Sequence, residues 1–300
     1  MIKTYPSFFI YFTVIILSLA IVMSSNNWFF SWMGFELSLF GFLPLFSTNS
    51  TTTEAIMKYF LMQASGSSMF LISFMMKTNN SFILAVLGMS MKLGIFPFYQ
   101  WMPLVMMALS WTGCAILTTF QKMAPLMMMF MLSSLKPTLV LGVMSIMLSS
   151  MMGFNQTLMR PLMAYSSISH TSFILLIMMF SAKMSVMYFS TYLLLTILLF
   201  LSFNKESTEK VNMVKNSVFQ AFTLLILAGI PPFSIFFFKA YIFFCMISNP
   251  MVVALLILST YISTYYYLSF IIPSLLNKSK VNAKTMILAM VSMIPFLLFI

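Results

Sequence analysis

Charged residues are scarce in this chain of 300 residues, where they make up 6% of the sequence, and aspartate is absent. A soluble domain has about 25% charged residues, so this chain cannot build a water-facing surface. That excludes an ordinary soluble enzyme, a disordered chain and a nucleic-acid-binding module. The net charge of +11 instead indicates membrane orientation and contact with anionic lipid.

Residues that hold cofactors are also few. The two cysteines, Cys114 and Cys245, lie inside apolar runs without metal-ligand spacing, so we interpret them as core residues. The sequence has no phosphate loop, Rossmann glycines, CxxC motif or Ser/His/Asp arrangement. We therefore expect no metal, NAD, flavin, haem or iron–sulfur cluster to be held by this chain itself.

Long apolar stretches dominate the sequence, with 61% hydrophobic residues and a mean hydropathy of +1.03. A membrane-spanning helix needs about 20 apolar residues, and it satisfies its own backbone groups in lipid. We therefore predict an all-α polytopic membrane protein with about 11 transmembrane helices in one domain, residues 1–300, its first span retained rather than cleaved as a signal. The predicted spans are 8–23, 28–46, 56–76, 81–99, 109–133, 137–154, 160–180, 184–202, 217–246, 250–272 and 283–300.

Basic residues outside these spans are distributed unequally between the two sides. The side of the N-terminus receives nine of them, namely Lys3, Lys58, Arg160, Lys205, Lys210, Lys215, Lys278, Lys280 and Lys284. The other side receives three, namely Lys77, Lys136 and Lys183. The positive-inside rule therefore predicts an inside N-terminus and, with an odd number of spans, an outside C-terminus.

Five ionisable residues lie within the predicted spans: Glu36, Lys92, Lys122, His170 and Lys239. A charge at the bilayer centre costs about 2.5–3.5 kcal/mol on insertion scales, so these groups are expected to face the protein interior or water. Their proton affinities depend on burial and on neighbouring charge, so the set is typical of a proton path. The alternatives are lysines that extend to the interface and a histidine that is an ordinary core residue.

Two of the predicted spans contain helix breakers. One break contains Gly94 and Pro97, and the other contains Gly229, Pro231 and Pro232. Proline removes a backbone donor, and glycine adds conformational freedom. Paired interrupted spans with a nearby lysine are typical of the inverted repeats of transporters, so we interpret these five residues as broken-helix hinges. Two ordinary proline kinks are the alternative.

Smaller features add detail to this prediction. The run of small residues at 64–68 predicts a close contact between helices. Trp101 and Trp111 lie at the ends of apolar stretches and are interpreted as markers of the membrane interface.

Several motifs together resemble the chain 2 family of mitochondrial NADH–ubiquinone oxidoreductase, one of the antiporter-like families of the respiratory complex I membrane arm. They occur in the family's order between about residues 28 and 240. They are W-x-G-x-E at 32–36, TEA-x-x-KYFL at 53–61, KLG-x-x-PF-x-x-W-x-P at 92–103, QK-x-AP at 121–125, AYSSI-x-H at 164–170 and G-x-PP at 229–232 with Lys239 downstream.

The resemblance implies two inverted five-helix repeats, approximately 8–133 and 137–272, followed by a final helix at 283–300. It also implies a proton-translocation role for the five ionisable residues. Glu36 would pair with Lys92 at the first break, and Lys122 would connect the two half-paths. His170 would relay protons along the central axis, and Lys239 would be the terminal protonable group.

The same resemblance implies a subunit of H⁺-translocating NADH:ubiquinone reductase that takes part in moving protons from matrix to intermembrane space. FMN, iron–sulfur clusters and ubiquinone would be bound by other subunits. The implied location is the mitochondrial inner membrane, with the N-terminus in the matrix and the C-terminus in the intermembrane space. The implied partners are other membrane-arm subunits, including the neighbouring antiporter-like ones, and lipids such as cardiolipin, with no nucleic acid.

Two other functions remain open at the level of sequence. A stand-alone cation/proton antiporter subunit would use the same lysines and the same helix breaks. A structural scaffold with a vestigial path is disfavoured, because a scaffold gains nothing from the insertion cost of five ionisable groups.

Overall fold

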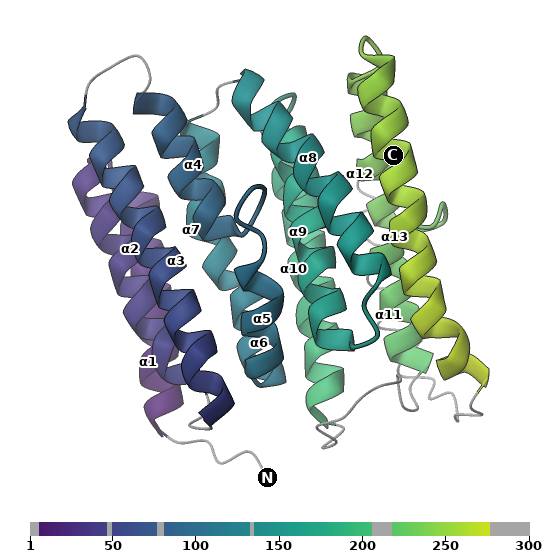
Figure 1. The fold of residues 1–300 in the computed structure, drawn as a ribbon, viewed down its shortest axis with the longest axis horizontal. Helices are drawn as coiled ribbons and strands as arrows, with labels where there is room; N and C mark the ends of the chain where they lie inside the picture. Colours follow the sequence, from purple (N-terminus) through teal and green to yellow (C-terminus); the bar gives the residue numbers. More distant parts are fainter. Residues whose placement is uncertain (1–5, 47–49, 77–80, 133–134, 206–217, 277–300) are drawn as a thin grey trace. The chain divides into compact units, whose positions relative to one another are not determined.

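The computed structural model describes residues 6–46, 50–76, 81–132, 135–205 and 218–276. These residues are helical with short connections, and they form no β-strand. The all-helical prediction is therefore confirmed for this part of the chain (Figure 1). The predicted final helix at 283–300 lies outside the described residues.

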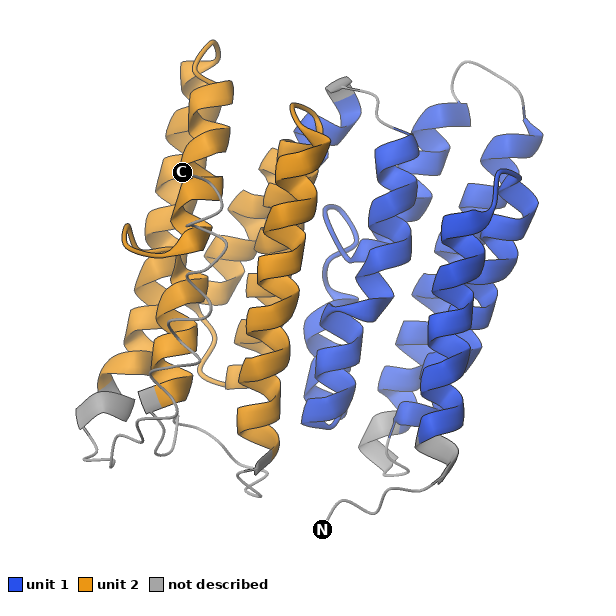
Figure 2. Cartoon of the chain, turned by 180° about the vertical axis from the view of Figure 1, so that it is seen from behind, with its two compact units in different colours: residues 1–141 blue, residues 142–300 orange. Residues whose placement is uncertain are grey.

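The chain forms two compact units, residues 1–141 and 142–300 (Figure 2). Unit 1 contains α1 (Pro6–Ser24), α2 (Trp28–Phe42), the short 3-10 turn η1 (Leu43–Leu45), α3 (Ser50–Met75), α4 (Ser81–Leu93), α5 (Trp101–Ala108), α6 (Trp111–Thr118) and α7 (Phe120–Met131). Helix α8 (Leu135–Phe154) includes the boundary between the units. Unit 2 contains α9 (Met159–Met178), α10 (Ala182–Lys205), α11 (Val218–Ala228), α12 (Ser234–Cys245) and α13 (Pro250–Leu276).

Six of the described helical segments are long and apolar enough to cross a membrane, namely Trp28–Leu45, Trp111–Met131, Pro137–Phe154, Met159–Met178, Ala182–Asn204 and Pro250–Ile272. Four further apolar segments are shorter, namely Phe9–Ser24, Ser81–Leu93, Phe219–Ala228 and Ser234–Cys245. Two of the predicted spans, 81–99 and 217–246, are interrupted, because α4 ends directly before Gly94 and α11 ends directly before Gly229.

The predicted continuous span 109–133 is divided at Thr119, between α6 and α7. The hydroxyl of Thr119 donates to the carbonyl of Ala115 at 2.6 Å, and that of Thr118 donates to the carbonyl of Cys114 at 3.0 Å. Such bonds from threonine to the preceding turn bend helices. The sequence analysis also missed α5, which follows the loop after α4.

In unit 1, helix α3 packs along α4, and α7 contacts both α1 and α4. The predicted close helix contact within 64–68 is confirmed at Gly66. A Cβ atom added there would lie 2.8 Å from the carbonyl oxygen of Gly88, and one added at Gly88 would lie 2.7 Å from the carbonyl oxygen of Gly66. The α3 and α4 backbones therefore touch at a pair of glycines, which brings their neighbouring side chains together.

In unit 2, helix α9 is buried along most of its length and contacts α10 and α12. Helix α11 contacts α10, α12 and α13, while most of α13 faces outward. The polar residues of α9 therefore lie in the interior of this unit.

Candidate functional site: buried ionisable groups at two helix breaks

The first helix break follows Leu93, the last residue of α4, and Lys92 is the residue before it. Gly94 has a φ of +67°, a left-handed conformation that favours glycine. The end of α4 leaves carbonyl groups without helical partners. The indole nitrogen of Trp101 donates to the carbonyl of Met91 at 3.1 Å, and the amide of Gln63 donates to the carbonyl of Lys92 at 3.2 Å. Two neutral side chains thus satisfy the broken end of the helix.

The interpretation of Trp101 as a marker of the membrane interface is wrong, because its side chain is buried against this break. Trp111 is buried as well. The indole of Trp101 is placed by its hydrogen bond to α4, and an apolar stretch that ends in tryptophan gives no indication of such a partner.

Lys92 is buried at 4% exposure, and its ammonium nitrogen lies 4.7 Å from the centre of the Phe35 ring. This is a cation–π contact, which stabilises a charged lysine away from water. The neighbouring carboxylate of Glu36 acts on Lys92 electrostatically. The two side chains form no direct ion pair, since a Glu36 oxygen instead accepts a hydrogen bond from the Ser67 hydroxyl at 2.5 Å.

Lys122 lies in the first turn of α7, directly after the break at Thr119, and is 2% exposed. Its amide nitrogen donates to the carbonyl of Thr119 at 3.1 Å. The adjacent Gln121 donates its side-chain amide to the carbonyl of Ser38 on α2, at 3.2 Å. The start of α7 is therefore attached to the helix that carries Glu36, and α7 also packs on α4, which carries Lys92.

The second helix break separates α11 from α12 at residues 229–233. Gly229 has a φ of +76°, and Pro231 and Pro232 follow it. Lys239, on α12, is 4% exposed and donates from its side-chain nitrogen to the carbonyl of Ala228 at 3.0 Å. The same nitrogen lies 5.6 Å from the centre of the Phe173 ring on α9. At this break the protonable lysine itself satisfies the end of the helix.

His170 lies on α9 and is 2% exposed. Its Nδ1 atom forms a hydrogen bond of 2.8 Å with the hydroxyl of Tyr188 on α10. The Tyr188 ring stacks on Phe238, the residue before Lys239, with ring centres 5.1 Å apart. Tyr188 thus bridges the histidine and the helix that carries the lysine, although nothing in the sequence analysis pointed to it.

The five predicted ionisable residues therefore fall into two groups, Glu36, Lys92 and Lys122 in unit 1 and His170 and Lys239 in unit 2. Gly94 and Pro97 lie at the first break, and Gly229, Pro231 and Pro232 at the second. Among the described residues, no cluster of three or more His, Cys, Asp or Glu side chains is suited to hold a metal.

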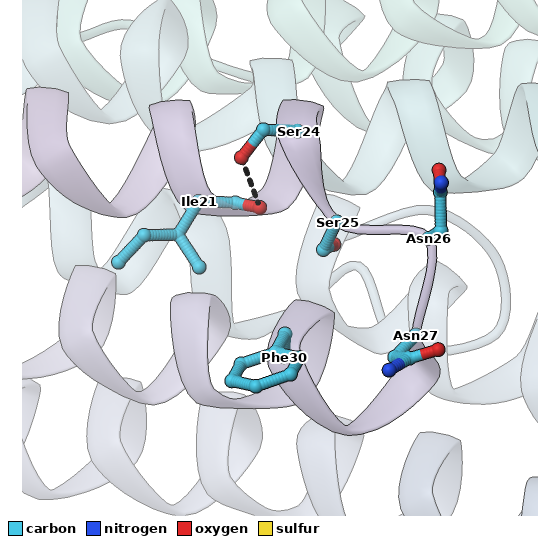
Figure 3. A pocket seen from close by; sticks show the side chains of 6 residues that line it. All are labelled: Ile21, Ser24, Ser25, Asn26, Asn27 and Phe30. Atoms are coloured by element: carbon cyan, nitrogen blue, oxygen red, sulfur yellow. Dashed lines mark hydrogen bonds between the residues drawn. The ribbon is translucent and has the colours of Figure 1, made fainter.

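A cavity of about 280 Å³ lies at the turn between α1 and α2. It is lined by Ile21, Ser24, Ser25, Asn26, Asn27 and Phe30, as Figure 3 shows. None of the five ionisable residues contributes to it. Its lining offers amide and hydroxyl groups but no titratable group, so it is separate from the candidate proton-carrying groups.

Comparison with known proteins shows the family of this chain. Residues 25–81 and 76–264 match the family described as NADH:quinone oxidoreductase/Mrp antiporter, TM. The NADH-ubiquinone oxidoreductase chain 2 of Lumbricus terrestris is 33% identical over 90% of this chain and 87% of its own length. The chain 2 of Anopheles gambiae is 35% identical over 75% of this chain and 72% of its own length. The chain belongs to the NADH-ubiquinone oxidoreductase chain 2 family.

Solved structures support the fold of this chain 2 family member. A chain of respiratory complex I from Thermus thermophilus with bound aureothin matches with a TM-score of 0.88 at 19% identity, over 99% of this chain and 80% of that one. A chain of the Mrp complex from Dietzia sp. DQ12-45-1b matches with a TM-score of 0.77 at 13% identity, over 86% of this chain and 58% of that one. The fold is thus that of an antiporter-like membrane domain.

Proposed function

We propose that this protein is a core membrane-arm subunit of NADH:ubiquinone oxidoreductase and takes part in proton translocation from matrix to intermembrane space, coupled to electron transfer from NADH to ubiquinone. The observation that carries the proposal is the burial of three lysines and a histidine inside otherwise apolar helices. Such groups are costly in a membrane and mark ion paths. Membership of the chain 2 family supports the same function.

In unit 1, we assign proton exchange to Lys92 and Lys122 and a modulating role to Glu36. Because the charge of Glu36 acts on Lys92, a change in the protonation of one affects the proton affinity of the other. The cation–π contact with Phe35 gives the charged lysine a partner without fixing it in a salt bridge. This arrangement is suited to a group that must both accept and release a proton.

In unit 2, we assign a relay role to His170 and a terminal role to Lys239. Histidine titrates near neutral pH, and its hydrogen bond to Tyr188 provides a first step for proton transfer. Lys239 hydrogen-bonds to a helix end rather than to a carboxylate. Loss of its proton would therefore alter the backbone environment of the break.

We propose eleven spans arranged as two inverted five-helix repeats and a final helix, with α4 and α11–α12 as the broken spans. Each break combines a glycine at positive φ, a following proline and a buried lysine facing an aromatic ring. Gly94, Pro97, Gly229, Pro231 and Pro232 would then be the hinges.

We place the protein in the mitochondrial inner membrane, with the N-terminus in the matrix and the C-terminus in the intermembrane space. Other membrane-arm subunits, including the neighbouring antiporter-like ones, and cardiolipin are the proposed partners. FMN, iron–sulfur clusters and ubiquinone would be bound elsewhere in the complex. The basic residues on the N-terminal side support this orientation.

The decisive experiment is Lys122→Met in the assembled complex, because methionine has a similar length and cannot ionise. We expect fewer protons pumped per NADH, or slower coupled turnover, measured in reconstituted vesicles. Lys183→Met is the matched control, since Lys183 is exposed at the start of α10. Normal pumping stoichiometry and turnover in Lys122→Met would contradict the relay.

A stand-alone cation/proton antiporter is the second candidate, favoured by the family description and by the structural match to an Mrp complex. Both functions use the same lysines, so substitutions do not separate them. Purification of the native protein does, because a respiratory subunit co-purifies with flavin- and cluster-containing partners. Recovery without such partners would favour the antiporter.

A further inference from the structure

Among the described residues, no side chain caps the N-terminus of α12, which begins directly after the second helix break. The helix has 12 residues and starts at Ser234, and the side chain of the preceding Phe233 cannot accept a hydrogen bond. The first N–H groups of a helix have no partner within the helix, and together with the helix dipole they favour a negative charge. The start of α12 is therefore suited to an anion or another acceptor.

The side chain of Ser234 gives a second, independent indication at the same place. It is 5% exposed, and its hydroxyl has no hydrogen-bond partner among the described residues. Cα–Cβ bonds in a helix tilt toward the N-terminus, so this hydroxyl lies on the side of the helix start. Buried hydroxyls are nearly always satisfied. A ligand that accepts hydrogen bonds both from Ser234 and from the backbone therefore fits this position.

A positive charge lies beside the same helix start. Lys239 follows Ser234 by five residues, and its side-chain nitrogen reaches back to the carbonyl of Ala228, 3.0 Å away. A Cβ atom at Gly229, in the connection that leads to α12, would lie 3.1 Å from this nitrogen. The ammonium group, the Ser234 hydroxyl and the first N–H groups of α12 therefore all lie at the second break.

Lys239 differs from Lys92 in its counter-charge. The carboxylate of Glu36 acts on Lys92, whereas the described residues of unit 2 include neither aspartate nor glutamate. The Ala228 carbonyl and the Phe173 ring, which lie near the Lys239 nitrogen, are neutral. A charge without a counter-charge is costly away from water. A charged Lys239 therefore needs a negative charge from outside the described part of unit 2.

We propose that the start of α12, with Ser234 and Lys239, is a binding site for a small monovalent anion such as chloride, which acts as the counter-ion of Lys239. The anion accepts hydrogen bonds from the Ser234 hydroxyl and from the first N–H groups of α12, as anions do at other helix N-termini. Half-helices at the breaks of transporters likewise direct their N-termini at anionic groups.

The surroundings of Ser234 favour an anion with one charge over one with two. Phe233 and Ile235 on either side of it are buried and apolar, and the cost of removing an ion from water rises with its charge. Pro231 and Pro232, which precede them, are exposed, so an anion reaches the break without crossing the interior of the unit. The site itself does not depend on the proposed function, but its effect on turnover rests on that function.

The first test replaces chloride by bromide in crystals of the assembled complex and measures anomalous scattering at the bromine absorption edge. We expect a peak in contact with the Ser234 Oγ atom that is weakened in Ser234→Ala and kept in Ser259→Ala. Ser259 is the matched control, because it is 1% exposed and its hydroxyl donates to the carbonyl of Leu256 at 2.7 Å.

Three results of this test would overturn the proposal. They are the absence of a bromide peak, equal density at the same place in halide-free crystals, which would show water, and a peak that Ser234→Ala leaves unchanged, which would show an adventitious ion only.

The second test measures NADH:ubiquinone turnover in vesicles while chloride is exchanged for gluconate at constant ionic strength. An uncoupler is present, so that movement of anions across the membrane does not limit the rate. We expect the wild type to slow several-fold as chloride is removed, and Ser234→Ala to need a several-fold higher chloride concentration for the same turnover. Recovery at high chloride separates weakened binding from misfolding. A wild type indifferent to chloride, or an identical chloride dependence in Ser234→Ala, would refute the counter-ion role.

Failure of this proposal and failure of the proposed function are distinguishable through Lys122→Met. If that variant loses pumping while crystals show no bromide at α12, the anion site is wrong and the proposed function stands. If Lys122→Met pumps normally while bromide binds beside Ser234, the proposed function fails and the anion site stands.

Discussion

The side-chain nitrogen of Lys239 donates a hydrogen bond to the carbonyl oxygen of Ala228, 3.0 Å away, across the break between α11 and α12. Ala228 is the last residue of α11, where carbonyl groups lack helical partners and where the helix dipole favours a cation. At the other break, Trp101 and Gln63 perform this capping instead. The proton on Lys239 is therefore coupled to the geometry of a helix end, whereas that on Lys92 is not.

This difference predicts that two substitutions of Lys239 separate structure from proton transfer. Lys239→Met leaves the Ala228 carbonyl without its donor, which costs about 1–3 kcal/mol of stability. Lys239→Gln keeps a donor but cannot titrate. We expect both variants to lose coupled turnover and only the methionine variant to lower the unfolding temperature of the complex clearly. Turnover restored by glutamine would refute a protonable role.

The glycine contact between α3 and α4 predicts a steric effect. Gly66→Ala inserts a Cβ atom 2.8 Å from a backbone oxygen, which cannot move without its helix. Overpacking of this kind costs about 1–3 kcal/mol. We expect reduced thermal stability and a lower level of assembled complex on native gels. Gly113→Ala is the control, because its close neighbours are side-chain atoms, and an equal loss there would argue against a specific α3–α4 contact.

The hydrogen bond from Ser67 to Glu36 predicts a positioning role for this serine. Hydrogen bonds to charged groups contribute about 1.5–3 kcal/mol. We expect Ser67→Ala to release the carboxylate, slow coupled turnover and alter its pH profile. Ser68→Ala is the matched control, since Ser68 is exposed and its hydroxyl bonds within its own helix. Identical pH profiles for the two variants would remove Ser67 from the mechanism.

The helices could be predicted from hydropathy because an apolar stretch in lipid has few alternatives to a helix. The ends of helices at Gly94 and Gly229 were predictable too, since glycine and proline act locally. The division at Thr119 was not, because threonine is compatible with both strands and helices. The division depends on the Thr119 hydroxyl, which donates a hydrogen bond to the preceding turn of the helix. A hydropathy pattern does not detect such a bond.

The charged members of the candidate site could be proposed from sequence because their cost in a membrane makes them rare. Their hydrogen-bond partners could not. Ser67 and Tyr188 belong to residue types that are common in these helices, and each acts on a residue of another helix. The resemblance implied that Glu36 pairs with Lys92, and the charge of Glu36 does act on Lys92. The hydrogen bond from Ser67 to the carboxylate and the Phe35 ring near the ammonium were not indicated by the sequence.

The conformation of Gly229 has a consequence for inherited variation. A Cβ atom at this position would strain a backbone with a φ of +76° and would lie 3.1 Å from the side-chain nitrogen of Lys239. A missense change in this codon therefore has two effects. It destabilises the fold, and it displaces the side chain of Lys239, the proposed proton carrier. We expect such alleles to be purged from populations even where the surrounding apolar residues drift freely.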